Sequence, residues 1–498
     1  MRFRILAARF AAVLSALVLV TAGLGLVIFE PDLPMHDGTV SAEPVTLPPA
    51  AAVTVCTPGP QQTSSDSGDE EFGNQASATH TLTTVIAQQP STPVLGHYRR
   101  AGTAETFPLP DTARGVSIYR NDNETLPGIV VVEPGGAGEP QLAGSTISIN
   151  DGGDLRGLSA APCIAPSSDM WLLGGATTVG SSATLVMTNA GQTTASVAVE
   201  LLSERGPLPQ TATTRTVAAG ASESLVLEGI GSEVERLAVH LTTSGGEVAA
   251  AVQYHGLSGI TPQGSGVITP SAPAARSLYI PGVQLSGDEG DDVVRLVNPH
   301  EETTTVSVQL LGKDGTLTLP GASDIPIDAH SVQDLSLTGV DAGDYTVMIT
   351  ASEPLVAGVQ LDTPGDEDRH AHTWLPTITP APTLLVPVVD DHDLSAQVQL
   401  TNPSDTAVDV TAVTIGTNGE EASGNSMTLK AHTTTNVEIA PGTRAVRLEA
   451  DSPIVAATVL KYRVGDETLR AVLPATALIR DGRVVHIDLG GSANQNSG

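Results

Sequence analysis

Two groups of acidic residues supply enough oxygen ligands to bind a calcium ion. They are Asp288, Glu289, Asp291 and Asp292 in the first group, and Asp390, Asp391 and Asp393, with His392 among them, in the second. Ca²⁺ binds to oxygen-rich loops of this kind. No EF-hand spacing is present, however, and residues 177–182 (TTVGSS) occupy the corresponding place in a related stretch of the chain. Solvated acidic turns are therefore the favoured interpretation, with calcium as the alternative.

A second candidate metal site is the pair His370 and His372, which alternate along the strand-like stretch RHAHTW. Alternate residues of a strand face the same side, so the two imidazoles could bind one metal ion. The sequence shows no third ligand, and ordinary surface histidines are the favoured interpretation. Trp171 and Trp374 could stack on a ligand, but we expect a tryptophan at the start of a β unit to cover the end of a core.

The motifs of the chain give no support for catalysis. No G-x-S-x-G sequence occurs, and HGLSGI (255–260) has the wrong spacing for a nucleophile elbow. The stretch GGAGEP (135–140) lacks the lysine of a phosphate-binding loop and is interpreted as a turn. We therefore expect a protein that is not an enzyme and has no cofactor, apart from the calcium alternative.

Residues 10–29 form an uncharged apolar run of 20 residues, FAAVLSALVLVTAGLGLVIF, which is long enough to span a bilayer as a helix. Arg2, Arg4 and Arg9 precede it, and basic residues stay on the cytoplasmic side of a membrane. The sequence therefore predicts a single-pass protein of the cell membrane, with its N-terminus inside and its bulk extracytoplasmic. A cleaved signal peptide is the alternative, although its apolar stretch would usually be shorter.

The two cysteines, Cys56 and Cys163, lie in the portion predicted to be exported, where disulfides persist. We expect a disulfide between them, which would close a loop of about 107 residues and stabilise the protein by roughly 4–5 kcal/mol. Two unpaired cysteines in a core are the alternative. Cys163 is better explained as a disulfide partner than as a nucleophile.

Composition excludes several classes of protein. Asp and Glu total 55 against 23 Lys and Arg, and the resulting formal charge of −32 repels phosphates, which excludes wrapping of nucleic acid. Hydrophobic residues make up 40% of the chain, enough to build cores and to exclude disorder throughout. Aromatic residues make up only 3%, so wide platforms for stacking bases or sugars are not expected.

Three stretches of the chain resemble one another. Each has a strand, an Asn with a turn, and a second strand: LVMTNAGQTTASVAVELL (185–202), VRLVNPHEETTTVSVQLL (294–311) and VQLTNPSDTAVDVTAVTI (398–415). Asn189, Asn298 and Asn402 align at spacings of 109 and 104 residues. Further anchors recur in the same order, among them VAAGASESLVL, IDAHSVQDLSL and LKAHTTTNVEI. The chain therefore contains duplicated units in which apolar and polar residues alternate as they do in half-buried strands.

A unit of this length has room for about seven strands, which fits an antiparallel sandwich of two sheets. The predicted fold is all-β, with tandem immunoglobulin-like β-sandwich repeats preceded by one N-terminal transmembrane helix. A β-propeller is the alternative, but its blades are typically only about 40–50 residues long. The Pro-rich joints ITPSAP (268–273) and ITPAP (378–382) predict stiff spacers, which would arrange the units as a rod.

The predicted order along the chain has a membrane-proximal part followed by four β domains. It comprises a cytoplasmic N-terminus (1–9), a transmembrane anchor (10–29), a stalk (30–52), an N-terminal β domain (53–165), three β-sandwich repeats (166–273, 274–382 and 383–490) and a disordered tail (491–498).

Residues 161–191, APCIAPSSDMWLLGGATTVGSSATLVMTNAG, combine a Cys, a Trp before a Gly-Gly pair, a Gly-Ser turn and a strand that ends in Asn. This signature resembles an actinobacterial family of exported, membrane-anchored proteins that carry a domain of unknown function. The resemblance extends from Cys56 to the last repeat. It implies an N-terminal anchor and tandem β units, and it assigns no catalytic or ligand-binding residues.

The predicted function is structural. Repeated β units, a membrane anchor at 10–29 and the lack of catalytic motifs favour a non-catalytic scaffold or spacer of the cell envelope that presents interaction surfaces. The membrane is then one partner, and other envelope proteins or glycans are further ones. A binding module for envelope glycans or another exported protein is the alternative, and an enzyme of unrecognised type is less favoured.

Overall fold

The computed structural model describes residues 44–46, 49–60, 79–88, 94–110, 115–122, 124–135, 139–208, 213–287, 290–366, 369–389, 394–422, 424–478 and 484–486. Across these ranges the chain is all-β, as predicted, with a short 3₁₀ turn at Leu227–Gly229. None of the helices found there is long and apolar enough to cross a membrane. The predicted anchor at 10–29 lies outside the described residues.

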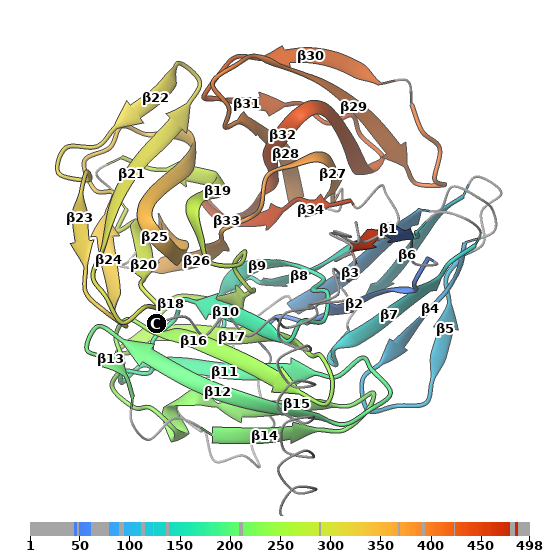
Figure 1. The fold of residues 1–498 in the computed structure, drawn as a ribbon, viewed down its shortest axis with the longest axis horizontal. Helices are drawn as coiled ribbons and strands as arrows, with labels where there is room; N and C mark the ends of the chain where they lie inside the picture. The colour runs from blue at the N-terminus through green and yellow to red at the C-terminus, as the bar shows by residue number, and fades with distance from the viewer. Residues whose placement is uncertain are drawn as a thin grey trace, which may run out of the picture. The chain divides into compact units, whose positions relative to one another are not determined.

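The chain divides into two compact units, one of residues 1–47 with 484–498 and the other of residues 48–483. In the first unit, β1 (Pro44–Thr46) pairs antiparallel with β35 (Val484–His486). The second unit contains all the other strands, which form four modules (Figure 1).

Each module is defined by the strands that it contains. Module N has β2 (Ala52–Cys56), β3 (Thr79–Gln88), β4 (Leu95–Arg100), β5 (Thr106–Pro108), β6 (Val116–Asp122), β7 (Gly128–Glu133), β8 (Gln141–Asn150) and β9 (Gly157–Pro162). Module 1 has β10 (Asp169–Leu173), β11 (Ser181–Thr188), β12 (Ala195–Ser203), β13 (Gly206–Pro207), β14 (Thr213–Val217), β15 (Ser222–Val226), β16 (Ala238–Ser244), β17 (Ala249–Ser258) and β18 (Thr261–Ile268). Module 2 has β19 (Ala275–Leu285), β20 (Val293–Val297), β21 (Thr304–Gly312), β22 (Gly315–Thr318), β23 (Ile325–Ile327), β24 (Val332–Ser336), β25 (Gly343–Pro364) and β26 (His370–Pro376). Module 3 has β27 (Ala381–Pro387), β28 (Leu394–Asn402), β29 (Val408–Gly416), β30 (Asn425–Leu429), β31 (Thr433–Val437), β32 (Thr443–Val464), β33 (Glu467–Pro474) and β34 (Thr476–Ala477).

All four modules share one arrangement of strands. In module 1 one sheet runs β10-β16-β12, with β13 and β14 beside β12, and the other runs β15-β11-β17-β18. Module N repeats this order as β2-β7-β4-β5 and β6-β3-β8-β9. In modules 2 and 3 a single long strand, β25 or β32, passes through both sheets and so takes the places of β16 and β17. The segment that we expected to be a separate N-terminal β domain therefore has the architecture of the repeats.

The expected immunoglobulin-type connection is not confirmed. In an immunoglobulin domain the first strand lies beside the second in one sheet. Here the first strand of module 1, β10, pairs with β16, and the second strand, β11, pairs with β15 and β17 instead. The two-sheet principle is kept, while the first and second strands of the module lie in different sheets.

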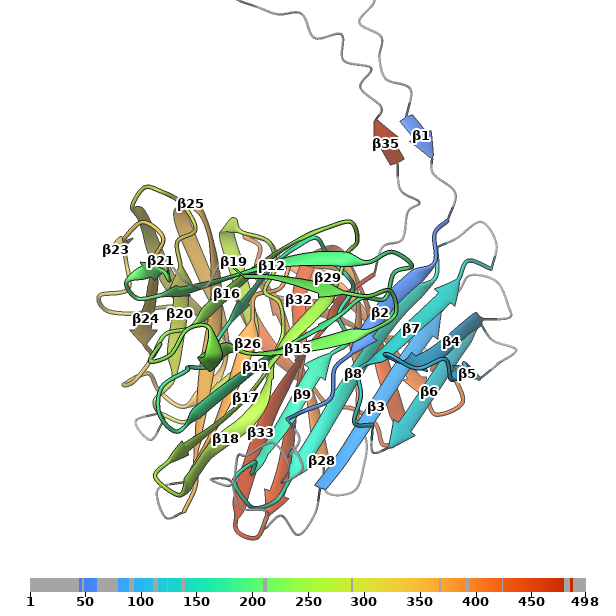
Figure 2. The ribbon, with the colours of Figure 1, turned by 90° about the horizontal axis from the view of Figure 1, so that it is seen from below.

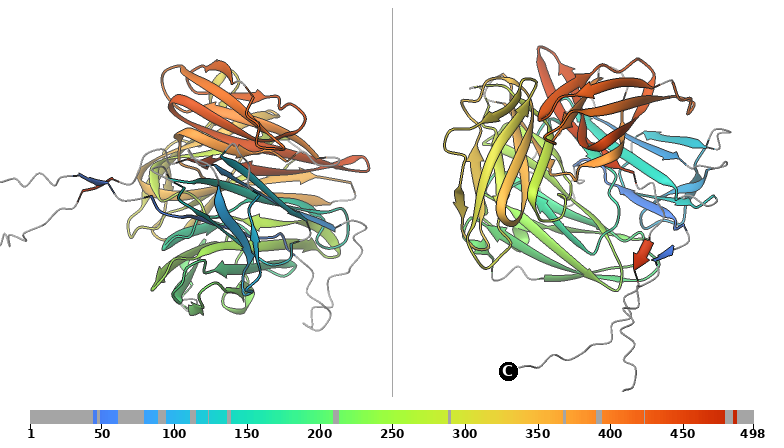
Figure 3. Two further views of the ribbon diagram at one scale, coloured as in Figure 1. Left: turned by 90° about the vertical axis from the view of Figure 1, so that its right-hand side faces the viewer. Right: turned by 45° about the horizontal axis from the view of Figure 1, so that its top comes forward.

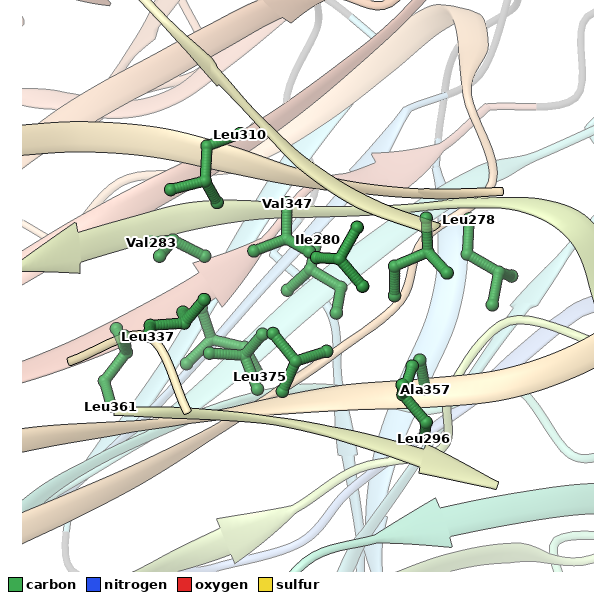
Figure 4. Close-up of a cluster of buried hydrophobic side chains, with 14 of the residues drawn as sticks. Leu278, Ile280, Val283, Leu296, Leu310, Leu337, Val347, Ala357, Leu361 and Leu375 are labelled. Carbon is green, nitrogen blue, oxygen red and sulfur yellow. The ribbon is translucent and has the colours of Figure 1, made fainter. Parts of the chain in front are cut away.

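Each module encloses a hydrophobic core between its sheets. In module 2, Leu278, Leu296 and Leu310 lie in one hydrophobic cluster, come from three different strands and are almost fully buried (Figure 4). The alternation that predicted half-buried strands holds in β21, where Val306, Val308 and Leu310 are buried and the residues between them are less so. Burial of this aliphatic surface, at about 25 cal/mol per Å², is the main favourable term in folding.

The aligned asparagines are buried, and each one hydrogen-bonds two connections within its repeat. The Asn298 side chain donates hydrogen bonds to the carbonyl oxygens of Glu302, Ile327 and Asp328 at 2.7–3.2 Å and accepts one from the His300 N–H at 3.0 Å. Asn189 and Asn402 make the corresponding bonds in their modules. Each Asn therefore satisfies backbone groups of two connections that the sheets leave unpaired, which explains why the same residue recurs there.

The last strands of the modules form a closed circuit. Strand β9 contacts β18, β18 contacts β26, β26 contacts β33, and β33 contacts β9. Figure 1 shows these strands gathered between the modules, and Figure 3 gives two further views of the modules. A shared cluster of Leu158, Ala371, Leu460 and Leu469 joins side chains from modules N, 2 and 3. The modules therefore pack around a common centre.

This arrangement corrects the expectation of a rod. The joint at 268–273 is not a free spacer, because the Ser271 N–H donates to Trp171 O at 2.9 Å and the Ser271 hydroxyl donates to Ala357 O at 2.9 Å. The Ala272 N–H also donates to Thr377 O at 2.9 Å. The joint is thus hydrogen-bonded to the modules on both sides, and its proline content does not extend it.

The predicted disulfide between Cys56 and Cys163 is present. It joins the end of β2 to the segment that follows β9, where Val55 and Ile164 also exchange two backbone hydrogen bonds of 2.8 Å. The bond therefore ties the first strand of module N to the chain that leaves it for module 1.

A buried ion-pair network closes the circuit between β33 and β9. Glu467 pairs with Arg156, and it also pairs with Arg369 at 2.9 Å and accepts the Asp366 N–H at 2.6 Å. Burial alone would raise the pKa of the Glu467 carboxyl, but the Asp366 N–H and the two arginines outweigh burial and lower this pKa below its usual range. The carboxylate is therefore needed in its charged form to hold the joint.

We expect Asn298→Ala to lower the free energy of unfolding by about 2–3 kcal/mol, because it leaves several buried backbone groups without partners. Urea unfolding monitored by circular dichroism measures the change. Asn425→Ala, at an exposed position in β30, is the matched control and should cost less than about 0.5 kcal/mol. Equal losses in the two variants would contradict the role given to Asn298.

We expect Glu467→Gln to lower the free energy of unfolding by about 3 kcal/mol at pH 7, because Arg156 then stays buried without its carboxylate. Folding lowers the pKa of Glu467, so the contribution of this carboxylate to the free energy of unfolding is complete at pH values above its unfolded pKa of about 4.3. The contribution is lost as the pH falls through the folded pKa. The difference between wild type and variant should therefore shrink toward acid pH in urea unfolding.

The control for this prediction is Glu421→Gln, which breaks the more exposed pair with Arg447. Solvent screening limits such a pair to about 0–1 kcal/mol. A Glu467→Gln effect as small as that of the control, or one that does not change with pH, would be inconsistent with a buried joint.

Candidate functional site

His370 and His372 lie on β26, and the structure supplies the third ligand that the sequence did not show. In the β25–β26 hairpin, Asp362 is the direct cross-strand partner of His372. His370 Nδ1 lies 2.9 Å from both carboxylate oxygens of Asp362, and His372 Nε2 lies 3.6 Å from Oδ1. One ligand atom from each residue lies within 4.8 Å of the others. Two nitrogens and one carboxylate oxygen therefore converge on one point.

Asp362 is fully buried, whereas both imidazoles are partly exposed. The Asp291 N–H donates to Asp362 Oδ2 at 3.1 Å, and the Asp362 N–H donates to Asp292 Oδ1 at 2.8 Å. These bonds fix the carboxylate and the backbone that carries it. Asp291 and Asp292 belong to the first group of acidic residues considered as calcium ligands. Both contact Asp362, which lies beside the histidine pair.

Burial shifts the pKa of two residues at this cluster. It raises the pKa of Asp292 to about 6, with the Asp362 N–H opposing and the Asp362 and Asp291 charges adding to the rise. Partial burial also lowers the pKa of His372 by more than the Asp362 carboxylate raises it. The environment therefore favours a neutral imidazole, which is the form that binds metal ions.

The remaining residues of the calcium prediction lie outside the described residues. They are Asp288, Glu289, Asp390, Asp391 and Asp393. The calcium interpretation therefore stays a prediction. Asp292 already uses one carboxylate oxygen as a hydrogen-bond acceptor for the backbone, which is a structural role.

The two tryptophans lie at joints between modules. Trp374 is buried against the core of module 1, as expected of a residue that covers a core, and the Arg295 guanidinium lies 4.6 Å from its ring centroid. Gly174 faces this ring so closely that a Cβ atom would lie 2.5 Å from it, which explains a glycine in the Trp-Leu-Leu-Gly-Gly stretch. Trp171 is half-buried and stacks on His240 with centroids 4.2 Å apart.

Arg295 is the polar centre of the joint between modules 1 and 2. Its side chain is only 4% exposed and makes two hydrogen bonds of 2.8 Å to Asp334. It also donates to the carbonyl oxygens of Gly175 and Leu237 at 3.1 Å. Because Arg295 alternates with buried Val294 and Leu296, the sequence pattern alone indicated a solvent-facing position.

A pocket of about 640 Å³ lies where the turns of all four central hairpins meet. The turns join β8 to β9, β17 to β18, β25 to β26 and β32 to β33, and Figure 2 shows the β17–β18 and β32–β33 hairpins extending toward the same end. Its described lining carries five carboxylates, Asp151, Asp154, Asp366, Asp466 and Glu467, against the two guanidinium groups of Arg156 and Arg369. We call this the four-turn pocket.

Sequence reasoning identified the histidine pair but missed Asp362 and the four-turn pocket. The hairpin turn after Pro364 was the available signal for Asp362, since its register places that residue opposite His372. No local signal indicates the pocket, because its residues come from turns that lie about a hundred residues apart in the chain.

Comparison with known proteins agrees with the expected domain of unknown function. The chain matches the family of unknown function DUF5719 over residues 119–379 and 371–494. Among curated proteins, none matches this chain. The matched segments cover the last part of module N, from within β6 onward, and all of modules 1, 2 and 3. The chain therefore belongs to DUF5719, a family whose function is unknown.

Proposed function

We propose that this chain is a non-catalytic scaffold of the cell envelope, anchored in the membrane through residues 10–29 and exposed outside the cytoplasm, which binds another exported protein at the four-turn pocket. The observation that carries the proposal is the convergence of four equivalent hairpin turns on one charged pocket. Binding sites are typically concave and formed where structural units meet.

The four modules form a ring through the contacts of β9, β18, β26 and β33, and the bonds between the modules support a scaffolding role. Polar bonds link neighbouring modules at the circuit, such as the Ser265 hydroxyl to Leu155 O at 2.7 Å and the Thr373 hydroxyl to Arg470 O at 3.0 Å. Together with the disulfide and the Glu467 network, these contacts hold the turns in fixed positions. A preorganised surface binds with a smaller loss of conformational entropy.

The charge of the pocket favours a basic protein segment as the partner. Arg156 and Arg369 both pair with Glu467, so the remaining carboxylates of the lining create an excess of negative charge. Such a surface attracts a cationic segment and orients its approach. None of the residues that line the described pocket is aromatic, which disfavours the alternative of a glycan stacked on rings.

A charge reversal tests the proposal. We expect Asp366→Lys with Asp466→Lys to lower partner crosslinking by about tenfold or more, because like charges then oppose a basic segment. Both side chains are exposed, so the ring should fold normally. A photo-crosslinking residue at position 260, which lines the pocket and is almost fully exposed, captures the partner in cells after membrane fractionation.

The matched control is Glu301→Lys with Glu302→Lys, which makes the same charge change at exposed positions of module 2 outside the pocket lining. It should crosslink as wild type does. Recovery of the protein in the cytosol, or equal crosslinking by both double variants, would overturn the proposal.

A further inference from the structure

We propose that Asp362, His370 and His372 form a binding site for one divalent first-row transition-metal ion, with zinc as the ion that fits best. The site bridges the two strands of the β25–β26 hairpin. This inference does not depend on the proposed partner binding.

The donor atoms already lie close to the positions that a metal ion requires. In a tetrahedral zinc site with ligands at about 2.0–2.1 Å, neighbouring ligand atoms lie about 3.3 Å apart. His370 Nδ1 and Asp362 Oδ1 are 2.9 Å apart, and His372 Nε2 and Asp362 Oδ1 are 3.6 Å apart. These two separations differ from 3.3 Å by only a few tenths of an ångström, and all three ligand atoms lie within 4.8 Å of one another.

A simple ion pair explains this arrangement less well. One buried carboxylate needs one cationic partner, yet two imidazoles are directed at Asp362, with ring centroids 6.1 Å apart. If both rings were charged, they would repel each other beside a single negative charge. As metal ligands both rings are neutral, and the ion supplies the positive charge that the carboxylate faces.

The surroundings hold the ligands in place. The Asp291 N–H bonds Asp362 Oδ2, and the Tyr254 hydroxyl donates to His372 O from the neighbouring module. Gly264 of β18, at φ +98°, faces the backbone of β26, and a Cβ there would lie 2.6 Å from His372 N. Such outer contacts orient metal ligands and increase affinity.

The donor set selects the class of metal. Calcium takes six to eight oxygen ligands, whereas this site offers two imidazole nitrogens and one carboxylate. Two nitrogens with one carboxylate are typical of zinc and related transition metals that keep an open coordination position. Both imidazoles are about 30% exposed, so an ion and a water molecule can reach the site.

Calorimetric titration of the full-length, chelator-treated protein with ZnCl₂ tests the site, with no polyhistidine tag present. We expect one saturable zinc ion per chain and visible absorption bands when Co²⁺ replaces zinc. His372→Gln should weaken zinc binding by at least about tenfold and should diminish the cobalt bands.

The matched control is His432→Gln, which removes a histidine that pairs with a single exposed carboxylate, Asp405, at 2.8 Å. It should bind zinc as wild type does. Circular dichroism confirms that both variants are folded, and His370→Gln provides a second ligand variant. Absence of saturable zinc binding by wild type, equal binding by His372→Gln and His432→Gln, or saturable binding of CaCl₂ alone would overturn the proposal.

Discussion

The need to cover four sheet edges is the constraint on which the second unit of this protein depends. Strands β9, β18, β26 and β33 each pair with only one neighbour in their own sheet, so their other sides would be open edges. Each edge is covered by the last strands of the neighbouring modules, and the contacts close on themselves. The cluster of Leu158, Ala371, Leu460 and Leu469 joins three of the four modules at this circuit, and an incomplete set of modules would leave apolar surface in water.

The closure creates one candidate site and packs module 1 against the other. The four-turn pocket exists because the hairpins that carry the covered edges end together. The histidine pair lies on β26, one of the four strands, and its backbone is contacted by Tyr254 and faced by Gly264 of module 1. The β25–β26 turn connects the two sites, since Arg369 binds Glu467 in the pocket and His370 follows directly on the strand.

Sequence reasoning succeeded where a structural role depends on local chemistry. The recurrent Asn, shown for Asn298, identified three of the four modules because its amide satisfies the same two backbone connections each time. Module N was predicted as a separate β domain and not as a repeat, because β3 ends at Gln88 without such an Asn, although its strand order is the same. The disulfide was predicted because two cysteines allow only one intrachain pair. Arg295 looked solvent-facing, since a period of two residues cannot show that a second module covers that face.

The sequence by itself determined the all-β class, the duplication, the Cys56–Cys163 bond and the pair of histidines on one strand, because each follows from residue type and short spacing. Only the tertiary structure decided that the modules close into a ring, that Asp362 joins the histidines and that four distant turns share a pocket. The physical reason is that edge covering depends on surfaces brought together from the whole chain, and that the residue opposite His372 depends on the register of the β25–β26 hairpin. A local pattern of apolar and polar residues shows that a face is buried, but it does not show what covers that face.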